Sequence, residues 1–227
     1  MNKYNCKNLI FSSSATIYSK DNSIPLKENA NFKPVNPYGN TKLAVERILE
    51  DIFYSSPKEW KICNLRYFNP IGAHDSGLIG EDPKDIPNNI FPLIQKVASS
   101  ELPKFTIYGD DWETIDGTCI RDYIHIMDLA EGHTIALKYL IKESPQIISF
   151  NLGTGIGTSV LELINTFEKV NNVNIPYVIG KKRDGDLPNV IADNSKSKKI
   201  LNWTPKRNIE DMCKDGWEWN LKKFFQN

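Results

Sequence analysis

The first 70 residues alternate between short apolar runs and one amphipathic segment. Residues 9–11 are apolar and end in three serines at 12–14, a pattern typical of a buried parallel strand that leads into a functional loop. Residues 19–37 are rich in Pro, Asn and Lys, which predicts an irregular surface segment. Apolar residues recur at helical spacing over 38–54, and 61–68 is the next apolar run. This order of strand, helix and strand predicts a βαβ unit with a right-handed crossover.

The apolar pattern changes after residue 72, where a loop rich in Gly and Asp begins. Shorter segments follow, without an internal repeat or a low-complexity linker. Their spacing predicts five helices, at 90–99, 126–142, 159–170, 195–201 and 209–224, and three strands, at 105–108, 147–152 and 175–179. The expected fold class is therefore α/β, with a Rossmann-like parallel sheet first and a smaller α+β part after it.

Composition narrows the class of protein. The 227 residues include 28 basic and 28 acidic side chains, so no charge excess favours nucleic acid or a membrane surface. We expect neither a signal peptide nor a membrane span, because no apolar run of the required length is present in these residues. The cysteines are scattered without metal-binding spacing, which predicts reduced thiols and a cytoplasmic location.

The strongest candidates for catalytic residues lie at two places: the serines that end the first strand, and the first turn of the helix that follows. Ser14 ends the strand, and Tyr38 and Lys42 lie one helical turn apart. An ammonium beside a phenol is expected to lower the pKa of Tyr38, so that its oxygen can accept a proton from a sugar hydroxyl. This layout suits hydride transfer, which needs a nicotinamide and a glycine-rich turn to hold it. Nothing before Ser12 supplies such a turn.

Two other patterns favour structural roles. Gly153–Gly157 lies between a strand and a helix, but its GxGxG spacing differs from the dinucleotide-binding GxGxxG and is more typical of tight packing. His74, His125 and His133 are too far apart in the sequence to indicate a metal site. No metal is expected.

An ordered series of short strings gives the chain a family resemblance. They are Phe11–Tyr18, Pro37–Leu43, Leu65–His74, Gly80–Pro83, Ile86–Ile90, Asp116–Thr118, Arg121–His125, Asn151–Gly153 and Gly185–Pro188. Together they resemble the UDP-glucose 4-epimerase branch of the extended short-chain dehydrogenases/reductases, an NAD-dependent epimerase/dehydratase family. The resemblance covers nearly all of the chain after residue 8. It lacks the family's N-terminal portion, which holds the GxxGxxG turn, an acidic ribose-binding residue and the first four strands.

The resemblance implies a mechanism in which tightly bound NAD is used and restored in each turnover. Tyr38 corresponds to the proton acceptor from the sugar 4-hydroxyl, and Lys42 to the residue that holds the nicotinamide ribose. Ser14 corresponds to a hydrogen-bond partner of the same 4-hydroxyl. Phe68 corresponds to a residue whose backbone approaches the nicotinamide. The 4-keto sugar would then turn over and take the hydride back on its other face.

The same resemblance implies a binding site for a UDP-hexose. The matching positions are Arg121 and Arg183 for the diphosphate, Asn69 and Asn89 for the sugar and diphosphate, Thr106, Ile107 and Tyr108 for uracil, and Asp186 for the ribose. Residues 1–70 would be the remnant of the NAD-binding domain, the C-terminal half of a Rossmann-like sheet. Residues 71–227 would be mainly the UDP-sugar-binding domain.

One position departs from the pattern of members restricted to glucose and galactose. These often carry a bulky Tyr two residues after the Gly-Asp-Leu-Pro string, where this sequence has Val190. The smaller side chain leaves room beside C2 of the sugar. We therefore expect the site to admit N-acetylated hexosamines as well.

Three hypotheses follow for the function. The chain is an epimerase whose complete form is active, an inactive remnant that at most binds UDP-sugar, or a related sugar-nucleotide reductase, dehydratase or decarboxylase. The third is disfavoured because Ala15 and Thr16 follow Ser14, without the acidic pair typical of the dehydratases. The exposed edge of residues 9–11 predicts poor expression and no turnover unless a complementing N-terminal fragment covers it. The resemblance also implies a homodimer that uses the Tyr38 helix.

Overall fold

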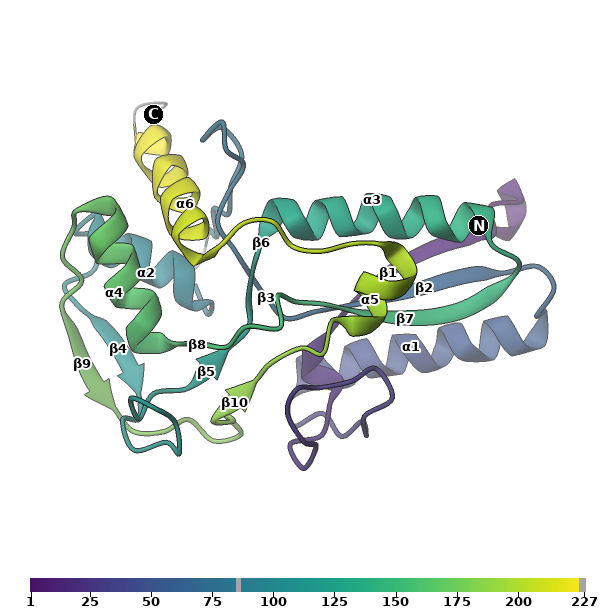
Figure 1. Ribbon diagram of the computed structural model, residues 1–227, viewed down its shortest axis with the longest axis horizontal. Helices are drawn as coiled ribbons and strands as arrows, with labels where there is room; N and C mark the ends of the chain where they lie inside the picture. Colours follow the sequence, from purple (N-terminus) through teal and green to yellow (C-terminus); the bar gives the residue numbers. More distant parts are fainter. Residues whose placement is uncertain (85–86, 225–227) are drawn as a thin grey trace. The chain divides into compact units, whose positions relative to one another are not determined.

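The computed structural model describes residues 1–84 and 87–224 and divides into two compact units (Figure 1). The first unit comprises residues 1–68, 128–156 and 190–205. The second comprises residues 69–127 and 157–189 and the segment from residue 206 onward. The first boundary lies beside the expected one at residue 70. The units are discontinuous, however, whereas the sequence pattern predicts two contiguous parts.

A three-stranded parallel sheet organises the first unit. Its order is β1 (Asn8–Ser14), β2 (Lys61–Tyr67) and β7 (Gln146–Leu152), with Ser14, Tyr67 and Leu152 at one level of the register. The third strand comes from late in the chain, which explains the discontinuity of the unit. Because the strands are parallel, their carboxyl ends share one edge, the place where ligands bind in open α/β sheets.

Helices cover both faces of this sheet (Figure 1). The helix α1 (Pro37–Ser55) packs against Ile62 through Leu49 on one face, and α3 (Ile126–Lys142) packs against Phe150 through Tyr139 on the other. The unit also contains the helix α5 (Ser195–Leu201) and the 3-10 turns η1 (Asn2–Tyr4) and η2 (Ala15–Ile17).

In its described residues, the second unit consists of short paired strands and three helices around a separate apolar core. The pairs β3 (Asn69–Ile71) with β6 (Tyr123–His125) and β4 (Phe105–Tyr108) with β9 (Tyr177–Gly180) are parallel. The pair β5 (Ile120–Arg121) with β8 (Thr158–Ser159) is antiparallel. The strand β10 (Asn189–Val190) lies at the boundary of the units.

The core of the second unit joins its helices α2 (Ile90–Ala98), α4 (Val160–Asn171) and α6 (Ile209–Phe224). Phe167 of α4 makes edge-to-face contacts with Phe91 and Trp217, at centroid distances of 5.8 and 5.7 Å. The aromatic geometry and the burial both stabilise this centre.

The expected helices and longer strands are present, with small shifts at their ends. The helix expected from residue 159 begins at Val160, because Ser159 is its N-cap and completes a capping box with Glu162. The strand expected over 175–179 is β9, from Tyr177 to Gly180. Periodicity did not predict β3, β5, β6, β8 and β10, because two or three residues are too few to show an alternation.

Candidate active site

The carboxyl end of β1 positions Ser14 with little freedom. Ser14 is 7% exposed, and its hydroxyl oxygen accepts hydrogen bonds from the backbone N–H and the hydroxyl of Thr16, at 3.2 and 3.0 Å. The serine thereby caps the short turn η2. Its side chain is held at the strand end, the position expected of a substrate-orienting hydroxyl.

Tyr38 and Lys42 are brought together by the start of α1. The side chain of Asn36 accepts a hydrogen bond from the backbone N–H of Gly39 at 2.7 Å, and Pro37 occupies the first turn. Tyr38 is 54% exposed. The ammonium nitrogen of Lys42 lies 5.4 Å from the centroid of its ring. Lys42 also donates to the carbonyl oxygen of Ser12 at 2.9 Å, which ties the helix start to β1.

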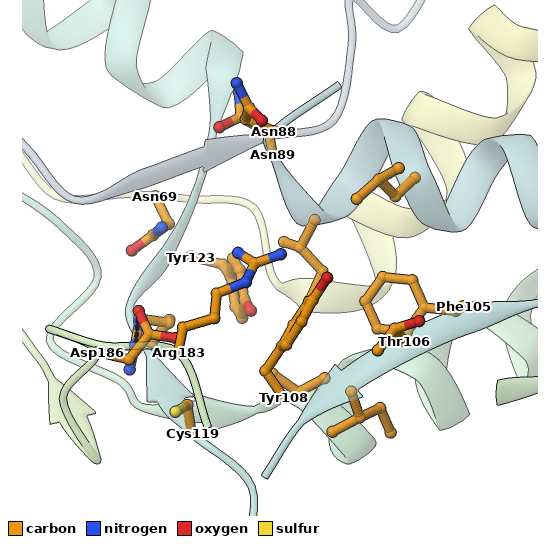
Figure 2. Close-up of a pocket in the computed structure, with 15 residues that line it drawn as sticks. Asn69, Asn88, Asn89, Phe105, Thr106, Tyr108, Cys119, Tyr123, Arg183 and Asp186 are labelled. Atoms are coloured by element: carbon orange, nitrogen blue, oxygen red, sulfur yellow. Dashed lines mark ion pairs between the residues drawn. The ribbon is translucent and has the colours of Figure 1, made fainter. Parts of the chain in front are cut away.

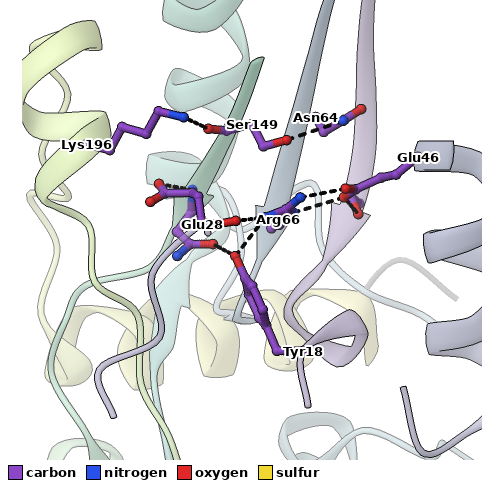
Figure 3. A network of polar contacts seen from close by, with 9 residues as sticks. Tyr18, Glu28, Glu46, Asn64, Arg66, Ser149 and Lys196 are labelled. Carbon is purple, nitrogen blue, oxygen red and sulfur yellow. Dashed lines mark hydrogen bonds and ion pairs between the residues drawn. The ribbon is translucent and has the colours of Figure 1, made fainter. Parts of the chain in front are cut away.

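A buried ion pair fixes the same helix to β2 one turn further on (Figure 3). Nε and Nη2 of Arg66 donate to the two carboxylate oxygens of Glu46, at 3.0 and 2.6 Å. The remaining nitrogen, Nη1, donates to the hydroxyl of Tyr18 and the carbonyl oxygen of Glu28, at 3.1 and 2.7 Å. Burial alone would lower the pKa of Arg66, but the bonds to Glu46 and Tyr18 outweigh it and raise that pKa. Burial raises the pKa of Tyr18 to about 12, so Tyr18 is a neutral member of the network.

Phe68 and Val190 lie in the apolar part of this unit. The backbone N–H of Phe68 donates to the carbonyl oxygen of Leu152 at 3.2 Å, and its ring is buried. Val190 is half-buried and packs against the cluster that contains Phe68. The first unit therefore contains Ser14, Tyr38 and Lys42 with both of these residues.

The second unit contains a pocket of about 190 Å³ (Figure 2). Eight of the residues that line it are predicted substrate contacts: Asn69, Asn89, Thr106, Ile107, Tyr108, Arg121, Arg183 and Asp186. They come from segments more than a hundred residues apart in the sequence. Ile86, in one of the strings behind the resemblance, lies outside the described residues.

Two arginines give the pocket its positive charge. The guanidinium carbon of Arg183 lies 3.6 Å from the centroid of the Tyr108 ring, a stacked arrangement visible in Figure 2. Nη1 of Arg121 donates to the carbonyl oxygens of Ile120 and Leu187, at 2.9 and 2.7 Å. Nη2 of Arg121 is 3.8 Å from a carboxylate oxygen of Asp186. Arg121 is thus anchored by the backbone, whereas Arg183 is exposed beside the aromatic ring.

Sequence reasoning missed the other residues that line the pocket: Asn88, Ile90, Leu93, Phe105, Cys119, Tyr123 and Val160. Burial raises the pKa of both Cys119 and Tyr123, so these groups are neutral at the pocket wall. Asn88 stands beside the predicted Asn89, and this adjacency was a usable signal. The apolar residues that line the pocket gave no such signal, because an apolar residue in a pocket and one in a core have the same sequence pattern.

The part of the Gly153–Gly157 turn that lies in the first unit, residues 153–156, is held by backbone geometry and hydrogen bonds. Gly155 has a φ of +76°, which favours glycine. The amide nitrogen of Asn194 donates to the carbonyl oxygens of Gly153 and Thr154, at 3.0 and 2.8 Å. Across residues 1–84 and 87–224, no group of three or more His, Cys, Asp or Glu side chains could hold a metal ion. In the same residues, no helix is both long enough and apolar enough to cross a membrane.

Comparison with known proteins supports the resemblance. The family model described as GDP-mannose 4,6 dehydratase matches residues 1–216. The chain is 50% identical over 223 residues to a bifunctional UDP-glucose 4-epimerase and UDP-xylose 4-epimerase of Arabidopsis thaliana, and the match covers 98% of this chain. The chain spans only 63% of that protein's length.

Two crystal structures show the same fold. A UDP-glucose 4-epimerase from Stenotrophomonas maltophila, with NAD and formylated UDP-arabinopyranose, has a TM-score of 0.96 and 43% identity, covering 100% of this chain and 67% of that one. An epimerase from Bifidobacterium longum, with NAD+ and UDP, has a TM-score of 0.92 and 46% identity, covering 98% and 66%. The chain belongs to the family described by the GDP-mannose 4,6 dehydratase model, and within it resembles the UDP-glucose 4-epimerases.

Proposed function

We propose that this chain provides the substrate pocket and the Ser-Tyr-Lys group of a UDP-glucose 4-epimerase. The observation that carries the proposal is the convergence of eight predicted UDP-sugar contacts on the walls of one pocket. The names of the relatives point to the same substrate class.

The pocket has the chemistry that a nucleoside diphosphate requires. Guanidinium groups at Arg121 and Arg183 suit the two phosphates, because their N–H groups form charge-assisted bonds with oxygen anions. The exposed face of Tyr108 and the neighbouring strand β4 suit a flat base such as uracil. The carboxylate of Asp186 is available to accept hydrogen bonds from ribose hydroxyls.

The first unit has the groups that act on the sugar 4-hydroxyl. In the proposed reaction, the phenol oxygen of Tyr38 accepts the proton of that hydroxyl while Ser14 orients it. The nearby ammonium of Lys42 stabilises the negative charge that develops on the Tyr38 oxygen. In the return half of the reaction Tyr38 would give the proton back to the sugar oxygen, so the protein is unchanged after each turnover.

The exposed Tyr38, the amine of Lys42 and the backbone at Phe68 fit the nicotinamide and ribose end of NAD. Hydroxyl and ammonium groups beside one another are the donors that ribose hydroxyls bind. NAD, when bound, supplies a reversible hydride acceptor for C4. The sequence contains no GxxGxxG string for the other end of the dinucleotide. We propose that a complementing N-terminal segment supplies that turn and pairs with β1, which lies at the edge of its sheet.

Further proposals concern specificity, assembly and location. Val190 in place of a bulky side chain supports use of N-acetylated UDP-hexosamines. The exposed Ile48 and Tyr54 on α1 support a homodimer through that helix. Four free cysteines support a cytoplasmic location, because reducing compartments keep thiols unpaired.

The test combines binding and turnover by purified residues 1–227. Calorimetric titration should show UDP binding that Arg183→Gln weakens at least tenfold, whereas Arg47→Gln, at an exposed position of α1, leaves it unchanged. With added NAD and the complementing N-terminal segment, UDP-galactose turnover should appear, and it should vanish in Tyr38→Phe. Absence of UDP binding would refute the proposal. Binding without turnover would favour the alternative, an inactive UDP-sugar-binding chain.

A further inference from the structure

A line of hydrogen bonds links Lys42 to a histidine on the opposite face of the sheet. Lys42 donates to the backbone carbonyl of Ser12. The hydroxyl of Ser12 is 2.6 Å from that of Tyr67 on β2, and the Tyr67 hydroxyl contacts Nε2 of His133 on α3. Nδ1 of His133 is 2.9 Å from the carbonyl oxygen of Leu129. All of these residues belong to the first unit.

The donor and acceptor of each hydrogen bond in this line can be assigned by starting from the bond between His133 and Leu129. A carbonyl oxygen only accepts, so Nδ1 of His133 carries a proton and donates to Leu129. In the neutral imidazole, Nε2 is then an acceptor, and the Tyr67 hydroxyl donates to it. Because the Tyr67 hydroxyl has a single proton, which this assignment gives to Nε2, the 2.6 Å contact with Ser12 then requires the Ser12 hydroxyl to donate. Burial raises the pKa of Tyr67, which keeps its proton available for this bond.

This arrangement holds Ser12 from two sides. Its carbonyl binds Lys42, and its hydroxyl binds Tyr67, although the strand register places Tyr67 opposite Ser14 rather than Ser12. The bond to Tyr67 is therefore a diagonal brace between β1 and β2. An edge strand has ladder partners on one side only, so a brace of this kind restricts the orientation of its last peptide groups.

We propose that Ser12, Tyr67 and His133 form a positioning chain that sets the Ser12 carbonyl and, through it, the amine of Lys42. The importance of that position for turnover rests on the proposed function, but the geometry of the chain does not. The competing explanation is simple packing, since the Tyr67 and His133 rings also meet edge to face at 5.2 Å. Packing alone predicts neither a fixed tautomer nor an effect on Lys42.

Nuclear magnetic resonance of ¹⁵N-histidine tests the chain without cofactor or turnover. The protein has three histidines, so His133→Gln assigns its signals. Near pH 8 we expect the Nδ1–H tautomer at His133 and a shift of its Nε2 signal in Tyr67→Phe. Tyr139→Phe is the matched control, because Tyr139 packs on Phe150 from the same helix and should leave the signal unchanged. An Nε2–H tautomer, or an unmoved signal in Tyr67→Phe, would overturn the proposal.

A measurement on Lys42 and a measurement of turnover complete the test. Reductive ¹³C-methylation, assigned with Lys42→Arg, should show a Lys42 signal that shifts in Tyr67→Phe and not in Tyr139→Phe. If the chain turns over UDP-galactose, Tyr67→Phe and His133→Ala should lower kcat about tenfold at unchanged KM, the effect of one ordinary hydrogen bond. His133→Gln, which keeps an acceptor near Nε2, should restore most of kcat. An unchanged Lys42 signal in Tyr67→Phe would refute the positioning role even in a chain without turnover.

Discussion

At the residue scale, the buried pair of Arg66 and Glu46 is held by a complete set of hydrogen bonds. The two residues are 3% and 1% exposed, and every guanidinium nitrogen of Arg66 has an acceptor. A buried charge is tolerated only when its partners are complete, because the interior does not replace the lost hydration. Glu46 lies one turn after Lys42, so the same pair holds this part of α1 against the sheet.

Removal of one partner should therefore be costly. Glu46→Gln is expected to lower the free energy of unfolding by about 3–5 kcal/mol, because a buried guanidinium loses its counter-charge. The double variant Glu46→Leu, Arg66→Met should be less destabilised than the single one. Urea unfolding measures both. As a control, Glu59→Gln breaks the exposed pair with Lys7 and should cost at most about 1 kcal/mol. Equal effects of the buried and exposed variants would contradict this explanation.

At the element scale, the first turn of α1 is positioned by close backbone contact as well as by its cap. A Cβ at Gly39 would lie 2.5 Å from the carbonyl oxygen of Thr16 and 2.9 Å from Cβ of Pro34. Only a residue without a side chain lets the helix start approach the loop after β1 so closely. The glycine between Tyr38 and Asn40 therefore has a packing role at the start of α1.

Gly39→Ala should consequently destabilise the protein, although alanine is the better helix former. Propensity alone predicts a gain of up to about 1 kcal/mol, whereas overpacking against a backbone oxygen costs about 1–3 kcal/mol. We expect the second effect to win, since a carbonyl oxygen in a packed turn cannot move away as a flexible side chain can. Thermal unfolding shows whether the variant is less or more stable than the parent protein. A raised midpoint would show that the loop moves to accommodate the added methyl group.

At the scale of the whole molecule, each unit has its own core and its own part of the predicted site. The first unit contains Ser14 at the end of β1 and Tyr38 and Lys42 on α1, and the second unit contains the pocket. Both units also contain carboxylates stabilised in their charged form. For Asp193, hydrogen bonds from Ser195 lower the pKa. For Asp116, burial raises the pKa, but bonds from Ser159 and Thr118 outweigh it and the net shift is downward.

These lowered pKa values determine how the free energy of unfolding changes with pH in the acid range. A carboxylate whose pKa is lower in the folded state stabilises the protein above its unfolded pKa, and the contribution is lost as pH falls through the folded pKa. The ordinary value for both aspartates is 3.8, so we expect the loss below about that pH. Urea unfolding between pH 5 and pH 2.5 measures it. Asp116→Asn should reduce the dependence of the free energy of unfolding on pH in this range. Asp51→Asn, on the exposed side of α1, should leave it unchanged.

The sequence by itself determined the local elements and the family. Helical spacing predicted α1 and α3 almost to the residue, because one face of each packs on a sheet and repeats every three to four positions. The spacing of Ser14, Tyr38 and Lys42 pointed to a proton-transfer group within one strand–helix connection. The ordered strings pointed to the epimerases, and the comparisons confirmed that resemblance.

Only the tertiary structure decided which distant residues meet. Nothing local pairs Arg66 with Glu46, brings Tyr67 to Ser12 and His133, or places β7 beside β2. The pocket likewise joins Asn69 to residues near Arg183. Periodicity reports which face of an element is buried, but long-range pairing depends on shape and polar satisfaction after the elements have packed. The sequence therefore indicated the chemistry of each residue, and the tertiary structure determined its partners.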